Sequence, residues 1–251
     1  MKAKTLCAAV LSTLILGGTV ASAAPGDPLT TNGNVHVENG RVDPEPGVTD
    51  PEKPDEKLPE LPNVKPNPNP DMGPLEISHA PILQFGEVQT ATTEVSAFAA
   101  ANKFTDAAGE EQSRGALLQF GDLRTDANGY TVNAKLTKQF TQTAGTGELT
   151  GSTITFTNPY EATALGSTGN KPAFETTVKL ELGDSALVAT AGNADRDGKG
   201  MWTVEYGSST NVNAEDTTAN SVELLIPAYT ASSMAGGDYQ ADIEWSITAA
   251  P

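Results

Sequence analysis

Carboxylates are the side chains of this sequence with the greatest catalytic potential. The chain holds 32 acidic and 15 basic residues, and hydrolysis of a glycosidic bond needs two carboxyl groups about 5–10 Å apart. Asp122, Glu205, Asp242 and Glu244 are the candidates for such a pair. Polar positions on acidic strands ordinarily face water, so we expect no catalytic residue, and glycan hydrolysis stays as an alternative.

Metal and cofactor chemistry has little support. The two histidines, His36 and His79, are far apart in the sequence, and the only cysteine is Cys7, whereas a zinc site needs three or four nitrogen or sulfur ligands. Residues 193–198 have the oxygen-rich opening of a calcium loop, but its twelfth position is Val204 instead of glutamate. We therefore predict a plain turn there, with no metal and no cofactor.

The N-terminus has the features of an export signal. Lys2 and Lys4 precede an apolar run, and Ala21-Ser22-Ala23 supplies the small-residue cleavage pattern. The run is shorter than the roughly 20 apolar residues of a membrane span. We expect residues 1–23 to be a signal peptide, with no membrane span after its removal. The mature chain would then have no cysteine, so we expect a fold without disulfides.

The charge of the chain excludes one class of partner. Loss of Lys2 and Lys4 with the signal would take the formal charge from −17 to −19. A protein this acidic repels nucleic acids, anionic lipids and teichoic acid. We expect no nucleic-acid partner.

Residues 24–74 differ in composition from the rest of the chain. They contain twelve of the seventeen prolines and none of the aromatic residues. Proline removes backbone donors and biases the preceding residue away from helix. With few apolar groups to bury, such a segment does not offset its ordering entropy. The sequence therefore predicts a disordered, acidic, Pro-rich linker.

Residues 75–251 contain every aromatic residue, and their hydrophobic pattern has a period of two, which is typical of half-buried strands. The expected strands are 75–78, 82–85, 117–123, 130–137, 153–157, 174–182, 202–206, 222–226 and 239–247. Turn sequences such as Asp197-Gly198 and Gly236-Gly237-Asp238 separate them. We predict one all-β domain, an antiparallel β-sandwich or barrel-like fold, with at most one helical turn within 93–108.

Two segments of this domain carry a family resemblance. The first, residues 122–132, reads Asp-Leu-Arg-Thr-Asp-Ala-Asn-Gly-Tyr-Thr-Val, and the second, residues 239–251, begins with Tyr239 and contains Trp245 and Ile247. Together they resemble the WxL surface domain of Gram-positive bacteria, with D-x-R…G-W-x-L and Y-x-x-x-x-x-W-x-L segments. This copy has Tyr130 and Val132 where Trp and Leu are usual, and Ile247 where Leu is usual. Each change keeps an aromatic or aliphatic group.

The resemblance implies a secreted protein at the cell surface, attached non-covalently to peptidoglycan. Its implied partners are other WxL proteins and a membrane-anchored surface protein that binds them. The implied wall-binding residues are Tyr130, Val132, Trp202, Trp245 and Ile247, with Asp122, Arg124, Gly129 and Tyr239 as supporting motif positions.

The role of the motif aromatics stays open at this point. Trp245 shares one strand face with Ile243 and Ile247, and Tyr130 shares one with Val132. Large aromatic groups in such positions contribute most when they are buried, which favours Trp245 as a core residue over a ligand contact. An adhesin or complex subunit held at the surface by a partner protein is the main alternative to direct wall binding.

Overall fold

The computed structural model describes residues 31–45, 47–126, 128–163, 170–194 and 196–250. The chain divides into two compact units, Met1–His36 and Val37–Pro251. The signal peptide expected at residues 1–23 lies outside the described residues. The described part of the first unit, residues 31–36, has exposed side chains and no regular secondary structure.

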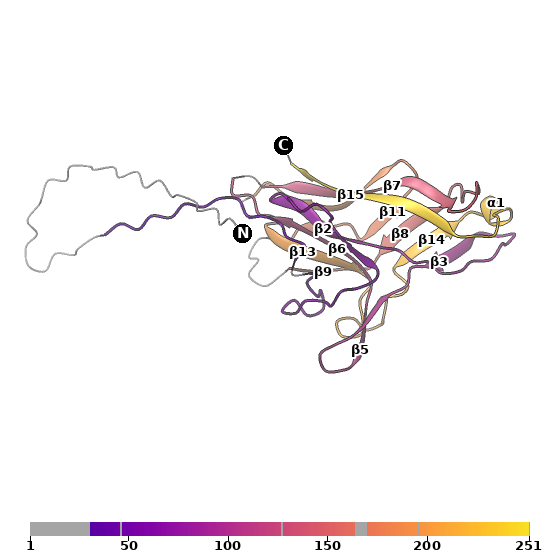
Figure 1. The fold of residues 1–251 in the computed structure, drawn as a ribbon, viewed down its shortest axis with the longest axis horizontal. Helices are drawn as coiled ribbons and strands as arrows, with labels where there is room; N and C mark the ends of the chain where they lie inside the picture. Colours follow the sequence, from indigo (N-terminus) through magenta and orange to yellow (C-terminus); the bar gives the residue numbers. More distant parts are fainter. Residues whose placement is uncertain (1–30, 46, 127, 164–169, 195, 251) are drawn as a thin grey trace, which may run out of the picture. The chain divides into compact units, whose positions relative to one another are not determined.

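The second unit is built from antiparallel sheets (Figure 1). The first sheet has the order β1 (Val64–Pro66), β2 (Leu75–Pro81), β6 (Ala116–Asp122), β13 (Gly200–Tyr206) and β9 (Pro159–Thr163). The second has the order β10 (Ala173–Phe174), β12 (Ser185–Ala191), β7 (Tyr130–Gln142) and β15 (Tyr239–Ala249). The third has the order β11 (Thr177–Leu180), β8 (Thr153–Thr157), β14 (Val222–Ile226) and β3 (Val95–Phe98). A separate hairpin joins β4 (Asn102–Thr105) to β5 (Glu111–Arg114), and the short helix α1 covers Ala228–Ala231.

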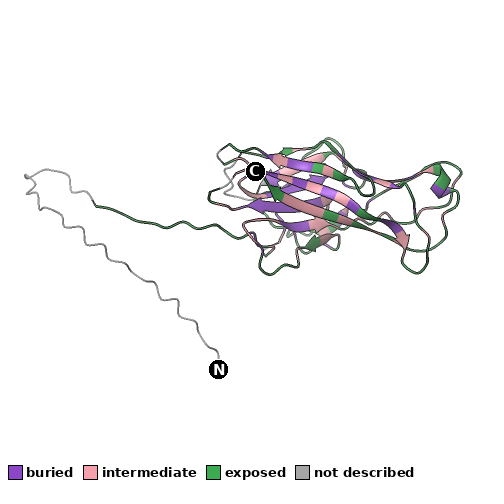
Figure 2. Cartoon of the chain, turned by 90° about the horizontal axis from the view of Figure 1, so that it is seen from above, coloured by how far each residue is buried: buried purple, intermediate pink, exposed green. Residues whose placement is uncertain are grey.

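The core lies between the second sheet and the other two, as in a sandwich. Phe156 on β8 contacts Tyr206 on β13 and Trp245 on β15, with ring centroids 4.9 and 5.7 Å apart. One side chain from each sheet thus meets at one point. The Phe156–Trp245 pair is edge-to-face, and such pairs add about 0.5–1.5 kcal/mol beyond burial. Buried and less buried positions alternate along β7 and β8, as period-two patterning requires, whereas β6 and β13 are buried along most of their length (Figure 2). The predicted all-β antiparallel fold is confirmed.

Several local predictions need correction. Residues 93–108, where at most one helical turn was expected, form the strands β3 and β4, and Val95 and Ala97 alternate with exposed neighbours on β3. The expected strand 174–182 is divided between β10 and β11, which belong to different sheets, and Leu182 is 50% exposed. Residues 82–85 form no strand. Strands β1, β3, β4, β5, β9 and β12 were not predicted, since their apolar alternation is short or weak.

The largest difference concerns residues 37–74, here called the N-terminal arm. Sequence composition predicts a disordered linker, yet the arm belongs to the same compact unit as the β domain. Aliphatic side chains spaced along the arm are buried, namely Val42, Val48, Leu58, Leu61 and Met72. Three of them pack with Leu117 of β6 in a small second core. Backbone bonds also hold the arm, because β1 pairs with β2 from Val64↔Pro81 to Pro66↔His79.

Candidate functional site

The first motif segment forms a polar cluster at the end of β6. The buried Asp122 carboxylate accepts two hydrogen bonds from the Arg124 guanidinium, at 2.9 and 2.8 Å, and one from Lys199 Nζ at 3.2 Å. Arg124 also donates to the Gly129 carbonyl oxygen at 2.9 Å. Gly129 has φ +76°, and a Cβ there would lie 2.0 Å from Asn193 Oδ1. The D-x-R…G spacing therefore lets Arg124 connect Asp122, at the end of β6, with the tight turn at Gly129.

Two motif aromatics share one backbone acceptor. Tyr130 Oη donates to the Gly198 carbonyl oxygen at 3.1 Å, and Trp202 Nε1 donates to the same oxygen at 3.0 Å. Tyr130 is fully buried and Trp202 is only 4% exposed. Burial raises the pKa of Tyr130 far above its usual value, so the hydroxyl remains a donor. These two side chains pack the core and leave no ring face open to a ligand.

The pKa of Asp122 connects this cluster to stability. Burial raises the pKa of the carboxyl, but hydrogen bonds and charge from Arg124, with Lys199, outweigh burial and hold it below its usual value. A carboxyl with a depressed folded-state pKa stabilises the protein above its unfolded pKa and loses that effect as the pH falls through the folded value.

Replacing Asp122 with asparagine should therefore cost about 2 kcal/mol of unfolding free energy at pH 7, because it removes the charge that Arg124 and Lys199 compensate. The cost should shrink as the pH falls through the lowered folded-state pKa of Asp122, where the wild-type carboxyl is also protonated. Urea unfolding followed from pH 7 into this acidic range measures it. Asp126→Asn, in the exposed part of the same turn, is the control; equal losses for both variants would contradict the role of the cluster.

The second motif segment lies beside the first. β15 pairs with β7 so that Ile247 lies opposite Val132 and Ala249 opposite Tyr130. Tyr239, Trp245 and Ile247 are half-buried and pack against the main core. The structure thus brings together the two motifs on neighbouring strands, but only the aromatics of β15 reach the surface.

Those aromatics border an open groove. It has a volume of about 490 Å³ and lies between β15, which is the last strand of its sheet, and the segment Ala80–Phe85 that continues from β2. Its lining includes Lys65, Phe85, Phe140, Tyr239 and Trp245. A second groove of about 610 Å³ adjoins it and shares Leu83–Phe85, Phe140 and Tyr239.

Sequence patterning did not locate this groove. Gln84 and Phe85 were expected only as residues of the strand 82–85, and Phe140 had no predicted role. Phe85 follows β2 in a stretch that has no strand partner among the described residues, and Phe140 lies on β7. No sequence signal set these two residues apart.

The acidic candidates for hydrolysis do not converge. Asp122 forms ion pairs with Arg124 and Lys199. Glu205 is buried on β13, where it lies opposite Leu117 of β6. Asp122 lies at the other end of the same strand pairing, opposite Gly200. Asp242 and Glu244 are exposed on β15, opposite Lys138 and Lys135. Asp122 and Glu205 are therefore separated along the β6–β13 pairing, whereas Asp242 and Glu244 lie two residues apart on the same exposed face of β15.

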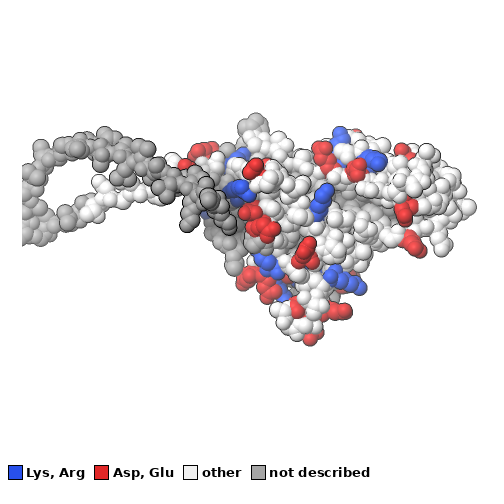
Figure 3. Space-filling model, in the orientation of Figure 1, with Lys and Arg blue, Asp and Glu red and all other residues white. Residues whose placement is uncertain are grey.

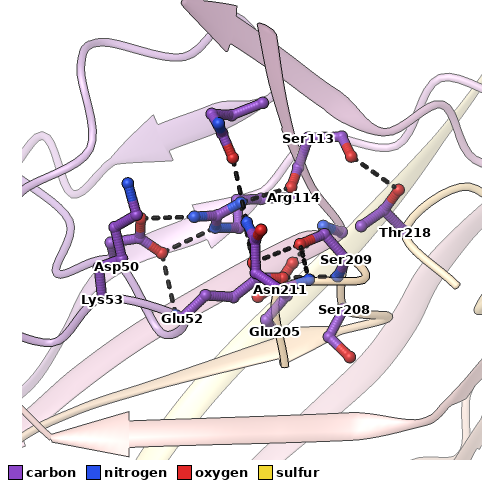
Figure 4. A network of polar contacts seen from close by, with 12 residues as sticks. Asp50, Glu52, Lys53, Ser113, Arg114, Glu205, Ser208, Ser209, Asn211 and Thr218 are labelled. Carbon is purple, nitrogen blue, oxygen red and sulfur yellow. Dashed lines mark hydrogen bonds and ion pairs between the residues drawn. The ribbon is translucent and has the colours of Figure 1, made fainter. Parts of the chain in front are cut away.

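Glu205 belongs to another set of charges, which sequence analysis missed. Arg114 is fully buried and makes two 2.7 Å hydrogen bonds to Asp50 and a 3.0 Å ion pair with Glu52 (Figure 4). Glu205 Oε1 accepts a 2.6 Å hydrogen bond from the Gly115 amide, and its Oε2 has no partner. Burial, together with the charges of Glu52 and Asp50, raises the pKa of Glu205 to about 9. The only sequence feature that could have indicated this buried charge cluster is the pair Asp50 and Glu52, which lies in the segment predicted to be a linker.

His79 and the calcium-like loop are the remaining chemical candidates. His79 is buried against Ser78, and burial with the Lys57 charge lowers its pKa to about 4, so it is neutral at pH 7. The calcium-like loop is only partly described, and there Asn170 Nδ2 donates to Asp197 Oδ1 at 2.6 Å. Within the described ranges, no group of three His, Cys, Asp or Glu side chains could hold a metal ion.

Comparison with known proteins agrees with the motif pair. The WxL domain family, described as surface cell wall-binding, matches residues 24–251. This chain belongs to that family. The family description implies a place at the cell surface or wall. No curated protein and no solved structure matches the chain. Among the described residues, no helix is both long and apolar enough to cross a bilayer.

Proposed function

We propose that this protein is exported, attaches non-covalently to peptidoglycan through its β domain, and serves as a non-catalytic member of a surface protein complex. The observation that carries the proposal is the family match over nearly the whole chain. The signal-like residues 1–23 and the acidic charge of −17 agree with an exterior location and disfavour polyanionic partners.

Sedimentation with isolated peptidoglycan sacculi tests this function. The purified protein should appear in the pellet in a saturable manner, and serum albumin at equal concentration should stay in the supernatant. If the protein remains in the supernatant between pH 4 and 8, direct wall attachment is wrong. Release of reducing ends from the same material would support the hydrolase alternative.

The acidity of the chain makes the interaction depend on pH. Lowering the pH from 7.5 to 4.5, towards the sequence pI of about 4.3, protonates part of the surface carboxylates and weakens repulsion from anionic wall polymers. Sacculus binding should strengthen by at least about twofold over this range. The same titration with sacculi stripped of anionic polymers is the control and should give a smaller change. Equal binding at both pH values would contradict this effect.

A second function has a specific structural feature in its favour. β15 is the last strand of its sheet and half of its side chains are exposed, and such an edge is a surface onto which a partner strand adds. The protein would then be held at the surface by a partner protein. Surface extraction from cells that lack the partner distinguishes the two: direct attachment persists, whereas partner-dependent attachment is lost.

A further inference from the structure

The groove beside β15 has the size and openness of a ligand site. At about 490 Å³ it falls within the roughly 300–1,000 Å³ of small-ligand sites. Together with the adjoining groove of about 610 Å³ it forms a continuous depression, because both share Gln84, Phe85, Phe140 and Tyr239. A depression of this extent suits a chain of linked units better than one compact molecule.

The charge of the two grooves disfavours an anionic ligand. Lys65 and Asp242 are the only charged residues that line the first groove, and the second groove adds Glu87 and Asp238 without a basic residue. The chain as a whole carries a formal charge of −17. The end of the domain that bears α1 also shows few charged side chains in Figure 3. A polyanion would meet repulsion from the protein and no basic cluster in the groove.

The lining also matches the two surfaces of a sugar ring. Phe85, Tyr239 and Trp245 are half-buried and present apolar ring surface in the groove. Aromatic side chains supply large contact area at low conformational cost. Gln84 and Gln240 are exposed beside them, and their amides both donate and accept hydrogen bonds. The hydroxyl and acetamido groups of a glycan require both hydrogen-bond donors and hydrogen-bond acceptors from the protein.

The geometry points to this groove as the glycan-binding site of the protein, with Tyr239, Trp245 and Phe85 as the stacking surface and Gln84 as a hydrogen-bonding residue. Its ligand is the uncharged sugar backbone of the wall, a chain of pyranose rings with hydroxyl and acetamido groups. This inference rests on the proposed wall attachment and assigns it to one surface. Tyr130 and Trp202 have no part in it, because both are buried on the Gly198 carbonyl.

Intrinsic fluorescence offers a direct readout, since the chain has two tryptophans and Trp202 is buried. A soluble hexamer of β-1,4-linked N-acetylglucosamine should cause a saturable change in emission that reports Trp245. An anionic hexasaccharide, such as hexagalacturonate, should cause no change in emission at pH 7. The absence of any change with the uncharged hexamer up to 10 mM, about the weakest useful affinity, would overturn the assignment.

Matched variants separate the groove from wall attachment in general. Tyr239→Ala should weaken binding to sacculi about tenfold and Gln84→Ala about threefold, as expected for truncation of an aromatic anchor and loss of a hydrogen bond. The controls are Tyr229→Ala, at a tyrosine that is 63% exposed on α1, and Gln89→Ala, at an exposed glutamine of the same segment. Both lie outside the two grooves and should bind like the wild type. Melting temperatures establish that each variant is folded.

The outcomes are distinguishable. If the wild-type protein binds sacculi and folded Tyr239→Ala and Gln84→Ala variants bind equally well, the groove is not the site, whereas wall attachment stands. If the wild type itself fails to bind, the proposed function is at fault. Displacement of the hexamer by an extended wall-stem or partner peptide, and not by longer glycans, would assign the groove to a peptide and overturn the glycan proposal.

Discussion

Arg114→Leu should lower the free energy of unfolding by about 3–5 kcal/mol, because it leaves two buried carboxylates without their cation. Asp50 and Glu52 have almost no exposed side-chain surface, and Arg114 contacts both at 2.7 and 3.0 Å. Whole domains have about 5–15 kcal/mol of stability. The loss is therefore a large share of the total.

Arg114→Lys provides a graded test of the same contact. Lysine keeps the charge but cannot reproduce the two parallel bonds to Asp50, so its cost should be intermediate. Arg41→Leu, at an exposed arginine in the N-terminal arm, should change stability by less than about 0.5 kcal/mol. Chemical denaturation measures all three, and similar values for Arg114→Leu and Arg41→Leu would contradict the role of the buried pair.

The same substitution should release the N-terminal arm selectively. Among the described residues of the arm, Asp50 and Glu52 form the ion pairs with Arg114. Glu52 also accepts hydrogen bonds from Ser209 and Asn211. In Arg114→Leu, limited proteolysis should cut within residues 43–62 before any other part of the domain, since that segment loses its buried ion pairs with Arg114. Uniform cleavage, or resistance equal to that of the wild type, would show that the aliphatic contacts alone hold the arm.

Glu205→Gln should stabilise the protein at neutral pH by up to about 3 kcal/mol. The wild-type carboxyl has its pKa raised to about 9 by burial and by neighbouring carboxylates. The folded protein therefore keeps a proton that the unfolded chain releases near its ordinary pKa of 4.5. Between the unfolded-state pKa of about 4.5 and the folded-state pKa of about 9, unfolding releases the Glu205 proton. The free energy of unfolding therefore falls as the pH rises from about 4.5 to 9.

Glutamine removes this pH dependence while keeping the shape of the side chain. Its carbonyl still accepts the Gly115 amide hydrogen bond now made by Oε1. The difference in melting temperature between variant and wild type should be small at pH 4 and should grow up to pH 9. Glu244→Gln, at an exposed position of β15, should show no such growth. A difference that is constant with pH, or of opposite sign, would contradict a protonated Glu205.

The β domain was predictable because its strands alternate apolar and polar residues over long stretches. β7 and β15 are long strands that follow this pattern, and their pairing brings the motif residues Val132 and Ile247 face to face. The N-terminal arm was not predictable from composition. Its order depends on widely spaced aliphatic residues and on Arg114, more than 60 residues away from Asp50, and no local pattern reports a contact at that distance.

The candidate site was predictable only in part. The motif residues were located, and periodicity indicated that Tyr130 belongs to the core, as its burial shows. Trp245 is half-buried, so it serves the core through Phe156 and borders the groove as well. The groove itself depends on how β15 lies beside the non-strand segment 82–85. That placement follows from tertiary packing, which one-dimensional spacing does not encode.

Binding to sacculi stripped of proteins and anionic polymers tests most directly whether this domain itself holds the wall glycan. The purified wild-type protein should sediment with this material along a saturable isotherm, and the uncharged N-acetylglucosamine hexamer should compete for it. A protein that stays in the supernatant until a second surface protein is added would contradict direct attachment.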